Sequence, residues 1–358
     1  MRIFAATPRY IQGAGILSDL GKHTVRLGQQ PFLIADSAVL TLLGKQMESA
    51  ISSAGMSLGI AEFPGEITHA IITDLTEQAR AHGTDVVIGV GGGKAIDAAK
   101  GVALSLGIRM ISVPTIASND GPASASIAVY DDQHLMVDVL QLKQNPDLVL
   151  VDSAIIAQAP LRFFLAGIGD AISKKFEAEA CAKAGAKTLF GAQVSHTGMA
   201  VADACYRLIR EHAQVAVTAV REQRVTPEVE SVIEATVLLS TLSFENGGLS
   251  IAHAIARGYS HLPRAAGTLH GDHVAYGLLV QLVLEQREPA MLQELLTFYR
   301  DIGLPYRLAH FCKGEPDADE IQLLADSSML SPSAARFTPK VDATQLAKAI
   351  VTVEKLEV

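Results

Sequence analysis

Short apolar runs alternate with helix-length segments through the first 160 residues. Runs of this kind, bounded by Gly, Pro or Asp, predict buried strands. They are PFLIAD (Pro31–Asp36), DVVIGV (Asp85–Val90), RMISVPT (Arg109–Thr115) and PDLVLVD (Pro146–Asp152). Between them, TDLTEQARAHG (Thr73–Gly83) has helical spacing and ends on a glycine. Strands separated by helices predict a mainly parallel sheet with helices on its faces.

The pattern changes after Pro160, where Ala, Leu, Glu and Lys dominate and helical spacing takes over. The predicted helices are Leu161–Ala184, Val229–Ser243, Leu249–Leu262 and Val274–Glu285. Before this point, Ser126–Leu140 has two apolar runs around Asp131-Asp132 and predicts a hairpin. We therefore expect an α/β domain over residues 1–160, an all-α domain over residues 161–358, and an active-site cleft between them.

Composition narrows the class of protein. A chain of 358 residues with 49% apolar residues suits two domains with a sizeable core. The formal net charge of -9 argues against nucleic acid as a partner. The three cysteines, Cys181, Cys205 and Cys312, are far apart and form no disulfide framework, so we expect a cytoplasmic setting. We expect no signal peptide in Met1–Tyr10 and no membrane partner, because no apolar run reaches the ~18–20 residues of a membrane span.

Glycines follow the strand Asp85–Val90 directly. Gly91, Gly92 and Gly93 precede Lys94, where a helix is predicted to begin. This turn departs from the Walker and Rossmann fingerprints. Glycines allow backbone N–H groups to approach an anion, and a helix N-terminus favours negative charge. The turn therefore predicts phosphate binding, with a ligand-free strand-to-helix turn as the alternative.

Two further segments follow predicted strands. Asp36 is suited to hydrogen-bond a ribose hydroxyl and to repel a 2′-phosphate, which favours NAD over NADP. It is equally suited to cap the next helix. The loop VPTIASNDGPAS (Val113–Ser124) is crowded with polar side chains at the predicted carboxyl edge of the sheet, where open α/β folds bind ligands. An ordinary loop capped by its own side chains is the alternative. The polar residues are Thr115, Ser118, Asn119, Asp120 and Ser124.

Candidate metal ligands lie in glycine-containing segments of the helical half. They are Asp170 in GIGDA, His253 in AHAI and His270 in LHG. One carboxylate and two imidazoles suit zinc or ferrous iron and leave positions for a substrate oxygen. Asp170 alone also suits a helix cap, and spacing alone does not favour these histidines over His261 or His273.

The motifs together resemble a known family. The order is GGGK with Asp97 and Lys100, then VPTIAS-x-D, GIGDA, AHAI and LHG. The sequence resembles the glycerol dehydrogenases of the iron-containing alcohol dehydrogenase superfamily, which share a dehydroquinate synthase-like fold. The resemblance extends to HGDHVAYGLLVQLVLEQ and weakens after about Leu304.

The resemblance implies a role for each motif. The glycine turn with Lys94 binds the pyrophosphate of NAD, Asp36 binds the adenosine ribose, and Asp120 contacts the polyol. Asp170, His253 and His270 hold a metal ion, which is zinc in this branch, and the enzyme is a dimer or an octamer of identical chains. The residues that line the nucleotide are Thr115, Ser118, Ser124, Ser126 and Tyr130.

Some positions depart from the family pattern. Lys174 stands where iron-dependent relatives have a further histidine, which favours a zinc site with three protein ligands. Asn119 and Gly121 replace the frequent Thr and Ala beside Asp120. Ala256 replaces a frequent His, and His273 a frequent Lys. These changes leave the identity of the polyol open.

The predicted activity is NAD-linked, zinc-dependent oxidation of glycerol or a related vicinal diol by hydride transfer. Alternatives on the same scaffold are an NAD(P)-linked dehydrogenase for another alcohol or a 2-hydroxy acid, and a 2-oxo acid reductase. A phospho-sugar cyclase requires a Lys/Arg cluster, which Ser118–Ser126 and Leu249–Gly277 do not provide. A non-catalytic nucleotide-binding protein has no use for the Asp/His/His set.

Overall fold

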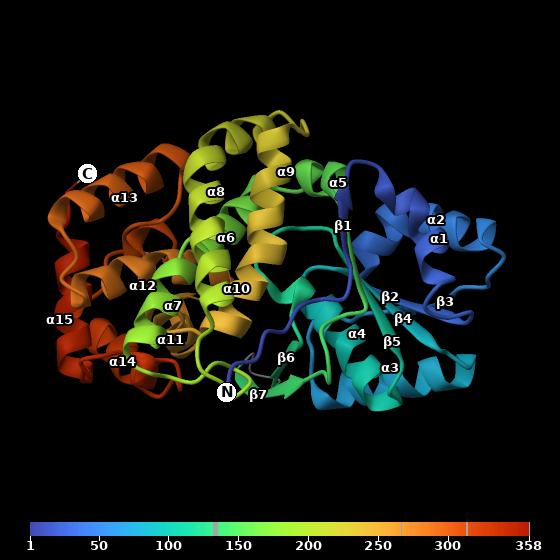
Figure 1. Cartoon of the computed structure of the whole chain (residues 1–358), viewed down its shortest axis with the longest axis horizontal. Helices are drawn as coiled ribbons and strands as arrows, with labels where there is room; N and C mark the ends of the chain where they lie inside the picture. The colour runs from blue at the N-terminus through green and yellow to red at the C-terminus, as the bar shows by residue number, and fades with distance from the viewer. Residues whose placement is uncertain (132–134, 266, 313, 358) are drawn as a thin grey trace. The chain divides into compact units, whose positions relative to one another are not determined.

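The computed structural model describes residues 1–131, 135–265, 267–312 and 314–357, and it divides into two compact units (Figure 1). The α/β unit consists of Ala5–Pro160 and Ala219–Leu238. The helical unit consists of Met1–Phe4, Leu161–Thr218 and Leu239–Val358. Asp132, in the predicted hairpin turn, and Ala266 lie outside the described residues.

A six-stranded sheet forms the centre of the α/β unit, and all of its strand pairs are parallel, as predicted. In spatial order its strands are β1 (Tyr10–Gly13), β8 (Leu148–Asp152), β5 (Arg109–Pro114), β4 (Val86–Gly91), β2 (Pro31–Ala35) and β3 (Gly59–Glu62). The predicted hairpin is a separate antiparallel pair of β6 (Ser126–Tyr130) and β7 (Met136–Gln141). The register places Gly91 opposite Pro114, so the glycine turn and the polar loop leave the same edge of the sheet.

Helices cover both faces of this sheet, as the alternation within β2 shows. Phe32 and Ile34 pack in one core with α3 and α4, whereas Leu33 and Ala35 pack in the other core with α2. Figure 1 shows α1 and α2 on one side of the sheet and α3 and α4 on the other. The helices of the unit are η1 (Ile16–Asp19), α1 (Leu20–Thr24), α2 (Ser37–Ser53), α3 (His69–His82), α4 (Gly93–Leu106), η2 (Gly121–Ala123), α5 (Ser153–Gln158), α9 (Pro227–Ile233) and the π-helical η3 (Glu234–Leu239).

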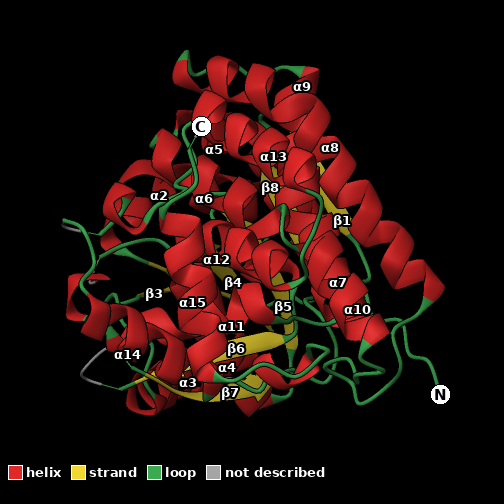
Figure 2. Ribbon diagram, turned by 90° about the vertical axis from the view of Figure 1, so that its left-hand side faces the viewer, coloured by secondary structure: helices red, strands yellow, loops and turns green. Residues whose placement is uncertain are grey.

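The helical unit is built from helices that pack directly on one another, notably α12 against α6, α11 and α15, and α10 against α7 (Figure 2). Its helices are α6 (Leu161–Ala171), α7 (Lys174–Lys183), α8 (His196–Arg221), α10 (Ser240–Gly247), α11 (Ile251–Gly258), η4 (Tyr259–His261), η5 (Pro263–Ala265), α12 (His270–Leu284), α13 (Pro289–Ile302), η6 (Leu308–His310), α14 (Ala318–Met329), η7 (Ala334–Arg336) and α15 (Ala343–Glu354). None of the helices formed by the described residues combines the length and the apolar character that a membrane crossing requires.

The structure corrects several predicted boundaries. The predicted helix Leu161–Ala184 is two helices, because α6 ends at Ala171 and α7 begins at Lys174. The predicted helix Val229–Ser243 is interrupted by the π-helical turn η3. Strands β1 and β3 were not predicted, since each is a four-residue edge strand with little apolar character.

The segment Ala219–Leu238 belongs to the α/β unit, although its helical spacing assigned it to the second half of the chain. The side-chain amide of Gln12 in β1 donates to the Glu230 carbonyl of α9 at 2.8 Å. The Ser153 hydroxyl donates to Glu230 Oε1 at 2.5 Å. These bonds join α9 to the edge of the sheet, a long-range pairing that helical periodicity does not report.

Candidate functional site

The glycine turn connects β4 to α4. Gly91 has φ of 140°, a conformation that side chains disfavour, and a Cβ there would lie 3.2 Å from the Ala95 side chain. Gly92 caps α4 without a side-chain bond to the first-turn N–H groups. A Cβ on Gly89 would lie 2.6 Å from Ala99 Cβ, so this glycine allows α4 to pack closely on β4. The turn thus exposes backbone donors at a helix N-terminus, the arrangement that binds phosphate.

Asp36 lies beside this turn and acts as a helix cap. Its Oδ1 accepts the Val39 N–H at 2.9 Å at the start of α2. Its Oδ2 lies 3.5 Å from the position that a Cβ on Gly91 would occupy. The capping alternative is therefore correct, and the same carboxylate also lies next to the turn where the ribose ligand is expected.

Lys94 is paired with another side chain in this structure. Its Nζ lies 2.7 Å from Glu66 Oε2 and 5.0 Å from the centroid of the Tyr130 ring. Burial, followed by the charges of Asp97 and Glu66, raises the pKa of Tyr130 to about 12, so Tyr130 keeps its proton at neutral pH. The charge of Lys94 is thus partly offset by Glu66.

The polar loop after β5 lies over the glycine turn. The Thr115 N–H donates to the Gly91 carbonyl at 3.1 Å. A Cβ on Gly93 would lie 3.3 Å from Asn119 Nδ2, which places this departure from the family pattern against the turn. Ser118 and Asp120 are half-buried in the loop, and Asp120 precedes η2. The loop and the turn therefore lie against each other within the α/β unit.

A buried ion pair anchors the end of this loop to α4. Lys100 is fully buried, and its Nζ lies 2.8 Å from Asp97 Oδ1. It also donates to the Gly121 carbonyl at 2.7 Å and to the Ser126 carbonyl at 2.9 Å, and it lies 3.4 Å from the hydroxyl of buried Ser124. Sequence reasoning assigned this pair no function. Opposite charges three residues apart on an otherwise apolar helix were the signal that could have identified it.

Asp97 and Ser126 extend the anchoring network to the hairpin. Asp97 Oδ2 accepts the Ala128 N–H of β6 at 2.9 Å. The Ser126 hydroxyl accepts from Gln141 Nε2 of β7 at 3.0 Å. Burial raises the pKa of Asp97 against the lowering effect of Lys100. The segment with the predicted nucleotide residues is therefore held by α4 and by the hairpin itself.

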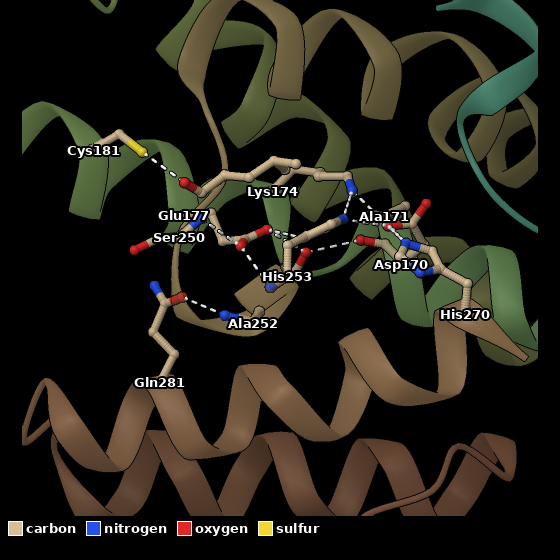
Figure 3. A network of polar contacts seen from close by, with 12 residues as sticks. Asp170, Ala171, Lys174, Glu177, Cys181, Ser250, Ala252, His253, His270 and Gln281 are labelled. Atoms are coloured by element: carbon tan, nitrogen blue, oxygen red, sulfur yellow. Dashed lines mark hydrogen bonds and ion pairs between the residues drawn. The ribbon is translucent and has the colours of Figure 1, made fainter. Parts of the chain in front are cut away.

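The metal candidates come together in the helical unit (Figure 3). Asp170 lies in α6, His253 in α11 and His270 at the first position of α12, and one ligand atom from each lies within 4.8 Å of the others. His253 Nε2 is 3.3 Å and His270 Nε2 is 3.9 Å from Asp170 Oδ1. Ligand atoms about 2.1 Å from a shared tetrahedral zinc ion would be about 3.4 Å apart, so the set fits a metal.

Two glycines explain how Asp170 and His270 come so close. A Cβ on Gly271 would lie 1.7 Å from the Ala166 carbonyl oxygen, and a Cβ on Gly169 would lie 2.5 Å from the Gly271 carbonyl oxygen. Side chains at these positions would push α6 and α12 apart. The glycines next to the candidate ligands are thus required for the contact between the helices that carry them.

Glu177, which the sequence analysis did not select, orients His253. Glu177 Oε2 lies 2.7 Å from His253 Nδ1, and Glu177 Oε1 accepts the backbone N–H groups of Ser250 and His253 at 2.7 and 3.1 Å. With Nδ1–H donating to Glu177, Nε2 faces Asp170 as a ligand atom. Burial lowers the pKa of His253, but Glu177 and Asp170 outweigh it and raise the pKa to about 9. A metal therefore competes with a proton for Nε2.

The two alternative histidines lie outside the group of ligands found among the described residues. His261 is exposed in η4. His273 stacks on Tyr259, with ring centroids 4.3 Å apart, and its Nε2 lies 2.5 Å from the Thr268 hydroxyl. Asp170 lies inside α6, and the cap position of α7 is Ser173, so the capping alternative for Asp170 is wrong.

Comparisons with known proteins agree with this arrangement. Residues 7–153 match the sequence pattern of the iron-containing alcohol dehydrogenase family. The chain is 40% identical to a glycerol dehydrogenase from Thermotoga maritima, over 84% of this chain and 82% of the relative. It is 36% identical to a glycolaldehyde reductase from Halobacterium salinarum, over 91% of this chain and 89% of the relative. The crystal structure of a probable glycerol dehydrogenase from Sinorhizobium meliloti superposes with a TM-score of 0.93 at 35% identity, over 99% of this chain and 98% of that chain.

The chain belongs to the iron-containing alcohol dehydrogenase family. It is an oxidoreductase similar to glycerol dehydrogenases, as the resemblance of its motifs implied.

Proposed function

We propose that the protein oxidises glycerol or a related vicinal diol with NAD as the hydride acceptor and zinc as the metal. The observation that carries the proposal is the convergence of Asp170, His253 and His270, with His253 oriented by Glu177. When bound, NAD supplies the hydride acceptor, and zinc supplies a Lewis acid that lowers the pKa of a substrate hydroxyl. Several relatives are glycerol dehydrogenases, which supports a polyol as the substrate.

The three proposed metal ligands differ in burial and in their hydrogen-bond partners. Asp170 supplies a buried carboxylate, and His253 supplies Nε2 in the tautomer that Glu177 selects. His270 is the most exposed of the three, with 46% of its side chain accessible. We propose that His270 completes the set on the side that the substrate reaches.

In the α/β unit, we propose that the backbone donors of Gly91, Gly92 and Gly93 bind the pyrophosphate of NAD. The support is the positive φ of Gly91, which glycine adopts readily, and the absence of a side-chain cap on the first turn of α4. Lys94 exchanges Glu66 for a phosphate in this proposal. Asp36 accepts hydrogen bonds from the adenosine ribose through the oxygen that lies beside Gly91.

We propose that Thr115, Ser118, Ser124, Ser126 and Tyr130 line the nucleotide. Asp120 receives a hydroxyl of the polyol. The support is the anchoring of the loop by Lys100 and Asp97, which holds these side chains in a defined segment. A positioned acceptor orients a substrate and lowers the entropic cost of reaching the reactive geometry.

Reduction of a small hydroxyaldehyde is a second candidate, since one relative is a glycolaldehyde reductase. A panel of NAD-linked rates separates the two. The substrates are glycerol, propane-1,2-diol, simple alcohols, 2-hydroxy acids and, in the reverse direction, glycolaldehyde, each with chelator and with added zinc. The proposal expects the highest kcat/KM for a vicinal diol and loss of turnover on chelation. Faster turnover of a 2-hydroxy acid, or full activity in metal-free protein, would contradict it.

We also propose that the enzyme acts in the cytoplasm as a homo-oligomer. The three cysteines are free and buried, which suits a reducing compartment. The oligomer rests on the family resemblance. Light scattering at micromolar concentration tests it, and a mass equal to one chain would contradict it.

A further inference from the structure

Lys174 carries a buried ammonium into the centre of the metal-ligand group. It is the first residue of α7, one helical turn after Asp170, and its side chain is fully buried. Its Nζ lies 2.5 Å from Asp170 Oδ1 and 3.0 Å from His253 Nε2 (Figure 3). These two atoms are also the atoms that Asp170 and His253 offer to a metal.

The geometry makes Lys174 a rival of the metal, because its ammonium occupies the Asp170 Oδ1 lone pair that a metal would use. Two ligands of one tetrahedral zinc ion would be about 3.4 Å apart. The 2.5 Å separation between Nζ and Oδ1 is that of a charge-assisted hydrogen bond, and an ammonium has no lone pair to donate to a metal.

The pair also explains how the helical unit tolerates a buried carboxylate without a metal. An isolated charge at the position of Asp170, of which 1% is exposed, would be strongly destabilising. The ammonium offsets this charge at short range. When a metal takes over the carboxylate, the flexible lysine stem allows the ammonium to move, and the ring of Phe244, with its centroid 5.8 Å from Nζ, remains a favourable neighbour.

We propose that Lys174 is a built-in competitor for the divalent cation, which keeps the metal-free site folded and lowers the affinity for metal. This inference rests on the proposed metal site. It goes beyond that site by assigning the chain an exchangeable metal, whose binding requires the Lys174–Asp170 pair to break.

The test compares zinc affinity and thermal stability in the full-length protein and its variants. Zinc affinity is measured at fixed pH by competition with a chromophoric chelator, and Tm is measured with and without zinc. Lys174→Met and the smaller change Lys174→Gln should both bind zinc about tenfold more tightly or better, since the competing charge is gone. Their metal-free forms should melt at a lower temperature than the unmodified protein, and zinc should restore most of the loss.

The matched control is Lys175→Met, which removes the next lysine along the helix. Lys175 pairs with Asp203 and lies 3.8 Å from Glu179, outside the ligand group. Its removal should leave zinc affinity unchanged. Unchanged zinc affinity in both Lys174 variants would overturn the inference. Weaker binding would overturn it too, because it would show that Lys174 supports the metal site and does not compete for it.

Asp170→Asn separates this inference from the proposed function. If Asp170→Asn loses zinc while the Lys174 variants match the unmodified protein, the metal site stands and the inference fails. If neither the unmodified protein nor any variant binds zinc, both the proposed metal site and this inference fail. A Lys174 variant that folds only when zinc is present supports the inference, and one that fails to fold with and without zinc contradicts it.

Discussion

Glu177 Oε2 lies 2.7 Å from His253 Nδ1, and the other oxygen of the same carboxylate accepts the His253 backbone N–H at 3.1 Å. One buried side chain therefore holds both the ring and the backbone of a candidate metal ligand. Burial raises the pKa of Glu177, but His253 and Lys174 outweigh it, so the group stays charged. This contact joins residues 76 positions apart and orients the imidazole so that Nε2 faces Asp170.

Glu177→Gln should therefore weaken zinc binding. The amide keeps the shape of the side chain but removes the charge that fixes the His253 tautomer, and loss of such a partner costs about 10- to 100-fold in metal affinity. Chelator competition measures this change. Glu179→Gln is the control, because Glu179 pairs with Arg287 instead. Equal zinc affinity in the two variants would contradict the role of Glu177 in orienting His253.

Lys100→Met should destabilise the α/β unit. It leaves Asp97 without its ion pair and the Gly121 and Ser126 carbonyls without their donor, a loss of about 3–5 kcal/mol for a buried charge pair. Urea unfolding measures the change. The double variant Asp97→Asn/Lys100→Met should regain part of the loss, because the unpaired charge is then also removed. Additive effects of the two substitutions would show that the pair is not coupled.

Asp36→Ala should have two separable effects. It should narrow the preference for NAD over NADP, because the charge facing the 2′-phosphate is lost. It should also lower stability by about 1 kcal/mol, because the Val39 N–H loses its cap. Asp36→Ser is the control, since serine caps the helix without a charge, and it should change the cofactor preference with little loss of stability. An unchanged ratio of kcat/KM for the two cofactors in both variants would contradict the ribose role.

The sequence predicted the central part of the fold because four inner strands are continuous apolar runs. β2 and β8 are buried along their whole length, and such runs are typical of a parallel sheet covered on both faces. The edge strands β1 and β3 lack this signal, since one face or end of an edge strand is solvated. The break between α6 and α7 was missed because Ile172 and Ser173, which separate the two helices, include no Gly or Pro that would mark a helix end.

For the candidate site, residue types could be predicted but contacts could not. Asp170 and His270 stand beside glycines in the sequence and His253 lies in a glycine-containing segment, and the structure brings the three together. Lys174 was noted only for standing where relatives have a histidine. Its contact with His253 joins residues 79 positions apart, and sequence spacing does not report such a contact. Glu177 was missed for the same reason.

His273 should make the protein sensitive to acid. Burial, followed by the charge of His270, lowers the pKa of His273 to about 3, whereas an unfolded histidine titrates near 6.5. The unfolded state therefore binds the extra proton as the pH falls from about 6.5 to about 3, and stability on the order of 4 kcal/mol is lost in that window. His273→Gln should flatten this part of the stability profile in urea unfolding, while His261→Gln, at an exposed position, should not. Parallel profiles for the unmodified protein and His273→Gln would contradict this role.

The most direct test of the metal-dependent dehydrogenase is the zinc content and NAD-linked glycerol oxidation of His270→Ala, compared with His261→Ala. His270 Nε2 lies 3.9 Å from Asp170 Oδ1, whereas His261 is an exposed histidine outside the ligand group. The account predicts that His270→Ala loses most of its zinc at limiting metal and about 100-fold or more of its rate while keeping its circular dichroism spectrum, and that His261→Ala keeps both. If His270→Ala retains its zinc and its rate, the metal site is wrongly assigned and the proposed chemistry fails.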